Sequence, residues 1–263
     1  MSNKLKDFDA VPLDLTKVFD SIQSLLLTSS PREKLIVILG ATATGKSSLA
    51  LTLAQALDTE IISADSMAVY RGFDIGTAKP SPAELKHIPH HMINILDAEE
   101  KFSVGEFVKR ARPIITQLNR RGKVPIVAGG TGLYIQALVE GYELDNVGKS
   151  LVSHFKRTGE LFYAAQIFGL TASRAELYER INRRTAQIFA DGLIDEVRNL
   201  LASGISPAAQ AMLGIGYKET VEYLNGSATL DETIAKVAQA TRNFAKRQLT
   251  WYRRMKYITW LKI

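Results

Sequence analysis

Residues 40–47 read Gly-Ala-Thr-Ala-Thr-Gly-Lys-Ser and match every fixed position of the phosphate-loop pattern G-x-x-x-x-G-K-[ST]. An apolar run at residues 35–39 predicts a buried strand before the loop, and residues 47–57 predict a helix after it. In that setting the loop N–H groups and the helix N-terminus point at phosphate oxygens. The sequence therefore predicts a site for a di- or triphosphate, formed by Gly40, Ala41, Thr42, Ala43, Thr44, Gly45, Lys46 and Ser47. Lys46 is expected to reach the terminal phosphate, and the Ser47 hydroxyl to help hold Mg²⁺.

Two further loops carry reactive side chains. Asp65 follows a predicted strand at residues 60–64, and Gly-Gly-Thr-Gly at 129–132 follows another at 123–128. Ligands of open α/β sheets bind at the carboxyl ends of such strands. We expect the Asp65 strand to lie beside the phosphate loop, which makes Asp65 a candidate general base, while a loop cap for Ser66 or Met67 stays open. Thr131 either donates a hydrogen bond to a reacting atom or caps the helix that follows.

These loops favour group transfer over hydrolysis. Phosphate-loop hydrolases usually carry an acid at the end of a second apolar strand, where it holds Mg²⁺ and helps orient water. Here the run at 124–128 ends in Gly-Gly-Thr, without a carboxylate. The pattern indicates a transferase that binds a phosphorylated donor and delivers a group to a second substrate.

Two other clusters have structural interpretations. His87, His90 and His91 lack a further histidine or acid at ligand spacing, so we assign them to a loop and not to a metal site. The charged run at residues 174–184 places Glu176 and Glu179 four positions before arginines, which is typical of a solvated helix face.

The whole chain predicts an α/β fold, a phosphate-loop core with a mostly parallel sheet flanked by helices on both faces. Further strands are expected at 91–96 and 164–170, helices at 103–121 and 133–139, and only helices from 173 to about 251. Residues 1–33 predict an N-terminal extension, an amphipathic helix and a linker, before a core at 34–263.

Composition narrows the class of protein. The 263 residues include no cysteine, which excludes disulfides and cysteine nucleophiles and fits a reducing, cytoplasmic setting. No apolar run is long enough to cross a bilayer, and the N-terminus lacks a signal-peptide pattern. The net charge is +6, and residues 241–263 hold seven cations and no acid, interleaved with aromatic rings. Such a segment suits a polyanion, although a solvated helix face stays open.

The chain resembles the bacterial tRNA dimethylallyltransferase family. The resemblance rests on the phosphate loop together with five further blocks that cover most of residues 35–263. These blocks are Ser-Ala-Asp-Ser-Met-Ala-Val-Tyr at 63–70, Arg-Gly-Phe-Asp-Ile-Gly-Thr-Ala-Lys-Pro at 71–80, Gly-Gly-Thr-Gly-Leu-Tyr at 129–134, Gly-Ile-Gly-Tyr-Lys at 214–218, and Thr-Arg-Asn-Phe-Ala-Lys-Arg-Gln-Leu-Thr-Trp-Tyr-Arg at 241–253.

The resemblance implies an activity. A dimethylallyl group passes from dimethylallyl diphosphate to the N6 amine of the adenosine just 3′ of the anticodon, in tRNAs that read codons beginning with U. The phosphate loop would hold the diphosphate, and Asp65 would accept the amine proton. Thr131 would contact the reacting region, while Arg247 would neutralise the departing diphosphate beside Lys46 and Mg²⁺. The target base must leave its stack to reach such a site.

The resemblance also implies tRNA contacts in three segments. These are Asp65, Ser66, Met67 and Ala68; Leu213, Gly214, Ile215, Gly216, Tyr217 and Lys218; and Lys246, Arg247, Gln248, Leu249, Thr250, Trp251, Tyr252 and Arg253. The expected partners are the tRNA anticodon stem-loop and dimethylallyl diphosphate, with Mg²⁺ as cofactor. We expect a monomer without membrane association.

One departure from the family is plain. The family inserts a helical domain after the Gly-Gly-Thr helix, where it grips the anticodon stem-loop, and here that insertion is largely absent near 142–160. The diphosphate site should survive this loss, whereas tRNA affinity should fall. Three alternatives therefore stay open: a prenyltransferase acting on free adenine nucleotides, a phosphate-loop small-molecule kinase, and a non-enzymatic RNA-binding module. The basic, aromatic C-terminal segment favours tRNA, because a small acceptor needs no such surface.

Overall fold

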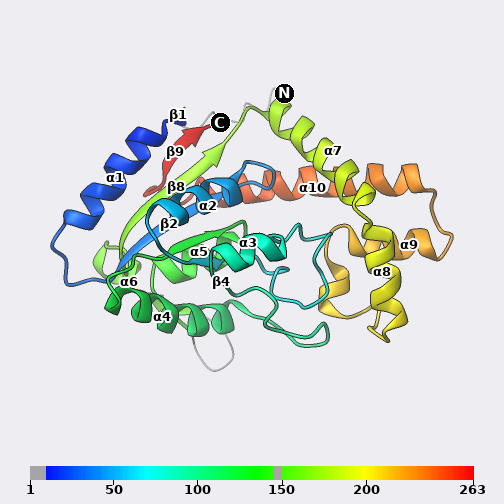
Figure 1. Cartoon of the computed structure of the whole chain (residues 1–263), viewed down its shortest axis with the longest axis horizontal. Helices are drawn as coiled ribbons and strands as arrows, with labels where there is room; N and C mark the ends of the chain where they lie inside the picture. The colour runs from blue at the N-terminus through cyan, green and yellow to red at the C-terminus, as the bar shows by residue number, and fades with distance from the viewer. Residues whose placement is uncertain (1–9, 145–149) are drawn as a thin grey trace.

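One parallel sheet organises the computed structural model, which describes residues 10–144 and 150–263 (Figure 1). Every neighbouring pair of its strands is parallel, so the predicted α/β fold is confirmed. Across the sheet the strands run β1 (Val11–Pro12), β9 (Thr259–Lys262), β8 (Ala164–Thr171), β2 (Lys34–Gly40), β5 (Ile126–Gly129), β3 (Ile61–Ser63) and β4 (His90–His91).

Helices cover both faces of this sheet and extend beyond it. Those of the first part of the chain are α1 (Leu15–Leu27), α2 (Lys46–Ala56), α3 (Pro82–His87), α4 (Val104–Arg120), α5 (Gly132–Val139) and α6 (His154–Thr158). The second part holds α7 (Arg174–Ala190), α8 (Leu193–Ala202), a short 3₁₀ helix (Gln210–Leu213), α9 (Tyr217–Leu224) and α10 (Leu230–Tyr252). Figure 1 shows α8 and α9 at the end of the molecule opposite α1. Within the described residues, none of these helices has the length and apolarity needed to span a membrane.

Strand β2 lies at the centre of the core. Its side chains alternate between the two faces, as the strand repeat requires. Ile36 and Ile38 belong to a buried cluster with residues of α1 and α2, whereas Leu35, Val37 and Leu39 belong to the cluster that contains residues of α4 and α5. Both faces are therefore apolar, which explains why residues 35–39 form an unbroken apolar run.

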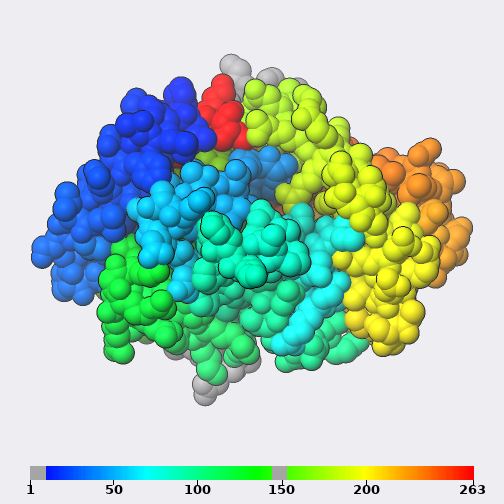
Figure 2. All heavy atoms as spheres, viewed as in Figure 1, coloured from blue at the N-terminus to red at the C-terminus, as the bar shows by residue number. Residues whose placement is uncertain are grey.

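The N-terminal segment is part of this body. The predicted amphipathic helix is α1, and its Val18 and Ile22 are buried in the same cluster as residues of β2 and β8. The short strand β1 pairs with β9, so residues from both ends of the described chain complete one edge of the sheet. In Figure 2 the atoms of α1 lie directly against the neighbouring segments. Residues 10–33 are thus packed on the core and are not a detached extension.

The strand order corrects one expectation about the site. We expected the strand that ends before Asp65 to lie beside the phosphate loop, but β5 pairs with both β2 and β3 and separates them. Chain order does not fix strand order in such a sheet. Asp65 follows β3, which is two strands away from β2, and the loop after β3 carries it to the site.

Other strands also differ from the prediction. The expected strand at 91–96 is limited to His90–His91, because Met92 and Asn94 adopt positive φ angles of 65° and 55°, which no strand accommodates. Strand β9 was not expected. Neither was the antiparallel hairpin of β6 (Tyr142–Leu144) and β7 (Ser150–Ser153), which lies where the family's insertion would begin.

The packing of α1 gives a first testable prediction. Ile22 is completely buried, so Ile22→Ala should lower the free energy of unfolding by about 2–5 kcal/mol through lost apolar burial and the cavity left behind. Leu27, on the same helix, is 86% exposed, and Leu27→Ala should change it by less than about 0.5 kcal/mol. Urea denaturation of both variants measures the difference. Equal midpoints for the two would show that α1 does not contribute to the core.

Candidate active site

The phosphate loop joins β2 to α2 in a fixed conformation. Gly40 has a φ of 151°, and a Cβ there would lie 2.5 Å from the carbonyl oxygen of Leu170 on β8. Gly45 is left-handed, with a φ of 79°, where it begins α2. The buried Thr44 donates its hydroxyl to the carbonyl of Ala41 over 2.8 Å. The loop therefore has its shape before any ligand binds.

Lys46 is the cation of this loop. Its Nζ donates to the carbonyl of Ala41 over 2.7 Å. Burial, followed by repulsion from Arg184, lowers the pKa of Lys46 to about 7, although attraction to Asp65 opposes both effects. An anion bound beside the amine would favour its charged form.

Gln248 of α10 connects the phosphate loop to the Gly-Gly-Thr loop. Its Oε1 accepts a hydrogen bond from the N–H of Thr42, and its Nε2 donates to the carbonyl of Gly130, each over 2.9 Å. A Cβ on Gly130 would lie 2.4 Å from that Nε2, so a larger residue there would displace the Gln248 amide. Similarly, a Cβ on Gly132 would lie 2.6 Å from the ring of Trp251. The glycine motif and the C-terminal motif therefore occur together because they pack against each other.

Asp65 and Thr131 both support the loop that follows β3. Asp65 Oδ1 accepts from the N–H of Met67 over 2.8 Å, which is the loop cap that the sequence left open. Thr131 Oγ1 accepts from the N–H of Ser66 over 3.1 Å. Thr131 precedes α5, but its side chain makes no capping bond to that helix. Both side chains also line a cavity, so their supporting bonds hold them in place there.

Two adjoining cavities open at the carboxyl ends of the strands. The phosphate-loop cavity, of about 130 Å³, contains Lys46 and Ser47 in its lining. The α7–α10 cavity, of about 350 Å³, is lined by residues of those two helices and by Thr131 and Arg247. The residues common to both linings are Thr42, Asp65, Thr77, Gly130, Arg184, Phe244 and Gln248. A diphosphate on one side and a second reactant on the other would meet beside Asp65.

The structure brings together most of the predicted site residues. The α7–α10 cavity is lined by Asp65, Ser66, Met67, Thr131, Leu213, Gly214, Ile215, Gly216, Tyr217, Arg247 and Gln248. Ala68 lines the phosphate-loop cavity instead, whereas Lys246, Leu249 and Arg253 line a separate one. Lys218 and Thr250 are exposed outside these cavities.

One residue that was predicted to contact tRNA lies inside the core. Tyr252 is completely buried in the cluster that contains residues of α4 and α5, so its side chain cannot contact a macromolecule. The adjacent Trp251 packs against Gly132. This part of the C-terminal motif serves packing.

Arg184 is the site residue that sequence reasoning missed. The run that contains it was interpreted as a solvated face, and Arg183 does pair with Glu179 over 2.6 Å. Glu176 instead forms a capping box with Ser173. Arg184 follows Ile181 by three positions and precedes Ile188 by four, and all three line the α7–α10 cavity. That helical spacing was the available signal.

Arg184 also changes the expected position of the cations. It lines both cavities and acts electrostatically on Lys46, whereas Arg247 lines only the α7–α10 cavity. The cation beside Lys46 is therefore Arg184, and Arg247 lies on the side of the second reactant.

The histidines have structural partners. His91 Nε2 lies 2.7 Å from Glu60 Oε2, and His90 Nδ1 lies 2.7 Å from the carbonyl oxygen of Ile88. Both contacts tie the β4 region to its surroundings. The predicted loop is wrong, because His87 ends α3 and His90 and His91 form β4.

Comparison with known families gives two matches. The IPP transferase family matches residues 68–160 and 144–255, and the isopentenyl transferase family matches residues 33–99. A protein of Pelotomaculum thermopropionicum named tRNA dimethylallyltransferase is 40% identical over 90% of this chain and 93% of its own length. One of Streptococcus pneumoniae with the same name is 40% identical over 88% and 93%.

Solved structures agree with these relatives. The tRNA isopentenylpyrophosphate transferase of Bacillus halodurans has a TM-score of 0.79 at 37% identity, with 88% of this chain and 90% of that one covered. A eukaryotic dimethylallyltransferase acting on tRNA has a TM-score of 0.75 at 26% identity, with 88% and 74% covered. These similarities extend over nearly the whole chain.

The alignments also indicate a missing segment. The alignment with the Pelotomaculum protein is 291 positions long, more than the 263 residues of this chain, although it covers only 90% of them. The relative therefore carries residues without a counterpart here. The match to the IPP transferase family is also divided into two parts that overlap at 144–160, as expected where a chain lacks a segment of its family.

The lowered pKa of Lys46 predicts how anion binding depends on pH. Below about pH 7 the free amine is charged, and above that pH it must take up a proton to neutralise a bound diphosphate. The Kd for dimethylallyl diphosphate should therefore rise by up to about tenfold per pH unit between pH 7 and 9. Isothermal titration calorimetry without acceptor measures this rise.

Lys46→Arg is the matched control, because a guanidinium stays charged throughout this range. Its Kd should change little between pH 7 and 9. A Kd for the unmodified protein that is equally flat would contradict the lowered pKa.

Proposed function

The chain belongs to the tRNA dimethylallyltransferase family, and we propose that it transfers the dimethylallyl group of dimethylallyl diphosphate to the N6 amine of the tRNA adenosine just 3′ of the anticodon. The observation that carries this proposal is the meeting of two cavities at Asp65. One cavity suits a diphosphate and the other admits a second reactant.

Donor binding follows from the phosphate loop. The N–H groups at the start of α2 and the Lys46 amine face the diphosphate, and Arg184 adds a second positive charge. As the allylic C–O bond breaks, the leaving diphosphate gains negative charge. Cations fixed at that position stabilise the transition state more than the bound donor, which is the condition for catalysis.

Asp65 suits the role of general base. The adenine N6 amine forms a C–N bond to the allylic carbon, diphosphate leaves, and the amine proton passes to the carboxylate. The bond from Met67 N–H to Oδ1 holds the Asp65 side chain in place. The carboxylate also lies in the wall shared by the two cavities, where the amine and the donor carbon would meet.

Mg²⁺ fits the groups present. Ser47 supplies a hydroxyl in the phosphate-loop cavity. No cluster of three or more histidine, cysteine or acidic side chains suited to a metal occurs in the part of the chain that the structure describes. Mg²⁺ accepts such a site, since it retains waters and takes phosphate oxygens alongside one or two protein ligands. When bound, it would neutralise charge on the leaving diphosphate.

The distribution of charge supports tRNA as the acceptor. Four cations line a further cavity of about 230 Å³, namely Arg174, Lys246, Arg253 and Lys262, and none of its lining residues is acidic. None of these four side chains lines the α7–α10 cavity, where a free nucleotide would bind. A sugar-phosphate backbone extends beyond its target base, and cationic side chains supply much of the affinity for such a backbone.

The missing segment affects how the tRNA is held. The hairpin β6–β7 and the short α6 follow α5 directly, at the point where the family's helical insertion begins. We infer that this chain grips less of the anticodon stem and depends more on the α7–α10 cavity and the cations beside it.

The acceptor assay tests the function directly. Labelled dimethylallyl diphosphate is offered with tRNA, with AMP, or with both. Label should appear in the tRNA, and diphosphate should be released in equal amount. Label on AMP alone would establish the free-nucleotide reaction instead, and phosphate transfer from ATP to a small molecule would indicate a kinase.

Asp65→Asn tests the general base. The amide oxygen can still accept from Met67 N–H, but the side chain no longer accepts the amine proton, so kcat should fall about 10²- to 10⁴-fold. The Kd for the donor should change less than about threefold. Asp58→Asn is the control, since Asp58 is 94% exposed in a surface ion pair with Lys123. A kcat for Asp65→Asn equal to that of the control would remove Asp65 from this role.

A further inference from the structure

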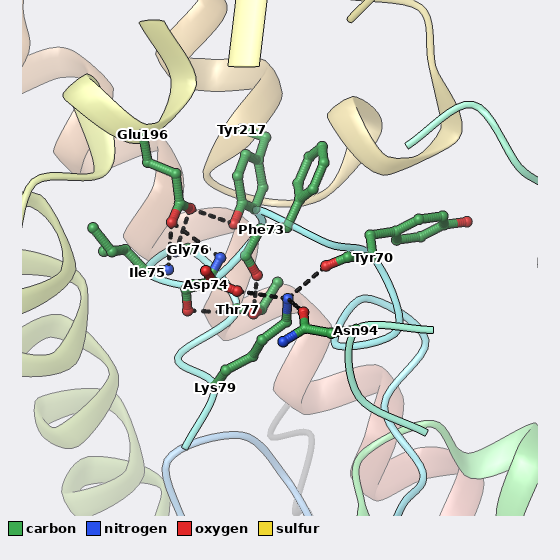
Figure 3. A network of polar contacts seen from close by, with 10 residues as sticks. All are labelled: Tyr70, Phe73, Asp74, Ile75, Gly76, Thr77, Lys79, Asn94, Glu196 and Tyr217. Atoms are coloured by element: carbon green, nitrogen blue, oxygen red, sulfur yellow. Dashed lines mark hydrogen bonds and ion pairs between the residues drawn. The ribbon is translucent and has the colours of Figure 1, made fainter. Parts of the chain in front are cut away.

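The carboxylate of Glu196 is surrounded by hydrogen-bond donors from one turn. Its Oε2 accepts from the N–H groups of Asp74 and Ile75, over 3.0 and 2.7 Å, and its Oε1 accepts from Gly76 N–H over 3.1 Å. The hydroxyl of Tyr217 donates to the same Oε1 over 2.7 Å. Figure 3 shows these four bonds converging from the turn and from α9 onto the side chain of α8.

The three N–H groups that bond to this carboxylate belong to consecutive residues of the turn, 74–76. Three successive N–H groups aimed at one point suit an anion and leave few other acceptors within reach. If the carboxylate were removed, the half-buried N–H groups of Ile75 and Gly76 would be left without partners, at a cost for each. The geometry therefore makes Glu196 the element that holds residues 74–76 in position.

Packing fixes the turn from the other side. A Cβ on Gly76 would lie 2.5 Å from the ring of Tyr217, so the backbone is in direct contact with that ring. The ring of Phe73 lies 4.9 Å from the same ring, centroid to centroid. Burial and the Glu196 charge raise the pKa of Tyr217, which keeps its hydroxyl a donor. The turn is thus clamped between a carboxylate and an aromatic ring.

A second support holds the far end of the segment. The Nζ of Lys79, whose side chain is nearly fully buried, donates to Asp74 Oδ1 over 2.7 Å and to Asn94 Oδ1 over 2.6 Å. In Figure 3 this lysine lies on the opposite side of the turn from Glu196. The residues between these supports are therefore held at both ends.

The held residues form part of the active-site wall. Gly76 lines the α7–α10 cavity, and Thr77 lines both cavities at their junction. The Thr77 hydroxyl donates to the carbonyl of Phe73 over 2.6 Å, so its position follows that of the turn. Glu196 lines neither cavity, so it acts on the reactants through the residues that it holds, which are this wall and Tyr217.

We propose that Glu196 is a positioning residue of the transfer reaction, whose carboxylate sets the Gly76–Thr77 wall where the acceptor amine meets the donor carbon. This inference rests on the proposed function. Small displacements at such a junction change the alignment of the reacting atoms, which affects kcat more than the binding of either substrate.

Glu196→Gln tests the proposal. The amide replaces one acceptor by an NH₂ group that faces further donors, so the turn should shift and kcat for tRNA should fall about 10- to 100-fold. The Kd for inorganic pyrophosphate should stay within about twofold, because the phosphate loop makes no bond to this turn. Glu179→Gln, at an exposed ion pair on α7, is the control and should retain full activity.

A second variant separates wall geometry from folding. Gly76→Ala should lower kcat, because its Cβ would lie against the ring of Tyr217 and displace the wall. The Kd for inorganic pyrophosphate should again stay within about twofold. A lower kcat at an unchanged pyrophosphate Kd supports the proposal, and full activity in Gly76→Ala would overturn it.

The unmodified protein in the same assay distinguishes the two proposals. If it transfers label to tRNA and Glu196→Gln has an equal kcat, the positioning role is wrong while the function stands. A fall in pyrophosphate binding parallel to kcat would also overturn the positioning role, because the defect would then be global. If the unmodified protein transfers no label, the function and the inference that rests on it both fail.

Discussion

The two hydrogen bonds of the Gln248 side chain determine how the active site is assembled. Parallel strands bring the phosphate loop and the Gly-Gly-Thr loop to one edge of the sheet, but they do not set the distance between those loops. The Gln248 amide does so, because one end accepts from Thr42 and the other donates to Gly130. A glutamate in its place would face the Gly130 carbonyl with a second acceptor. The choice of an amide is therefore chemical as well as steric, and it fixes α10 over the strand ends.

The charges around Asp65 are balanced only when an anion is bound. Lys46 and Arg184 repel each other, and Asp65 offsets this repulsion in part. A diphosphate supplies the negative charge that these cations lack. The fold thus bears an electrostatic cost in the free protein and recovers it on donor binding, as is common where stability and function compete.

Local patterns in the sequence were enough to predict the phosphate loop and most strands and helices, because each of these is encoded within a short stretch of residues. The apolar run at 35–39 and the helix after it needed no partner to be recognised. What could not be read locally were relations between distant segments: β5 between β2 and β3, the pairing of β9 with β8, and the burial of Tyr252. The role of Arg184 in the site was missed because its charged neighbours suggested a solvated helix face, although Ile181 and Ile188 lie on the same side of the helix. The glycine positions were apparent as a motif, but their cause, contact with Gln248 and Trp251, emerged only from the packing.

The pairing of β1 with β9 has a consequence for how the protein folds. Val11 pairs with Leu261, so this contact closes almost the entire chain into one loop. Contacts of such long range are entropically costly and form late. During synthesis on the ribosome, β1 has no partner strand until β9 has been made. We therefore expect β1 to complete the edge of the sheet only after β9 has formed.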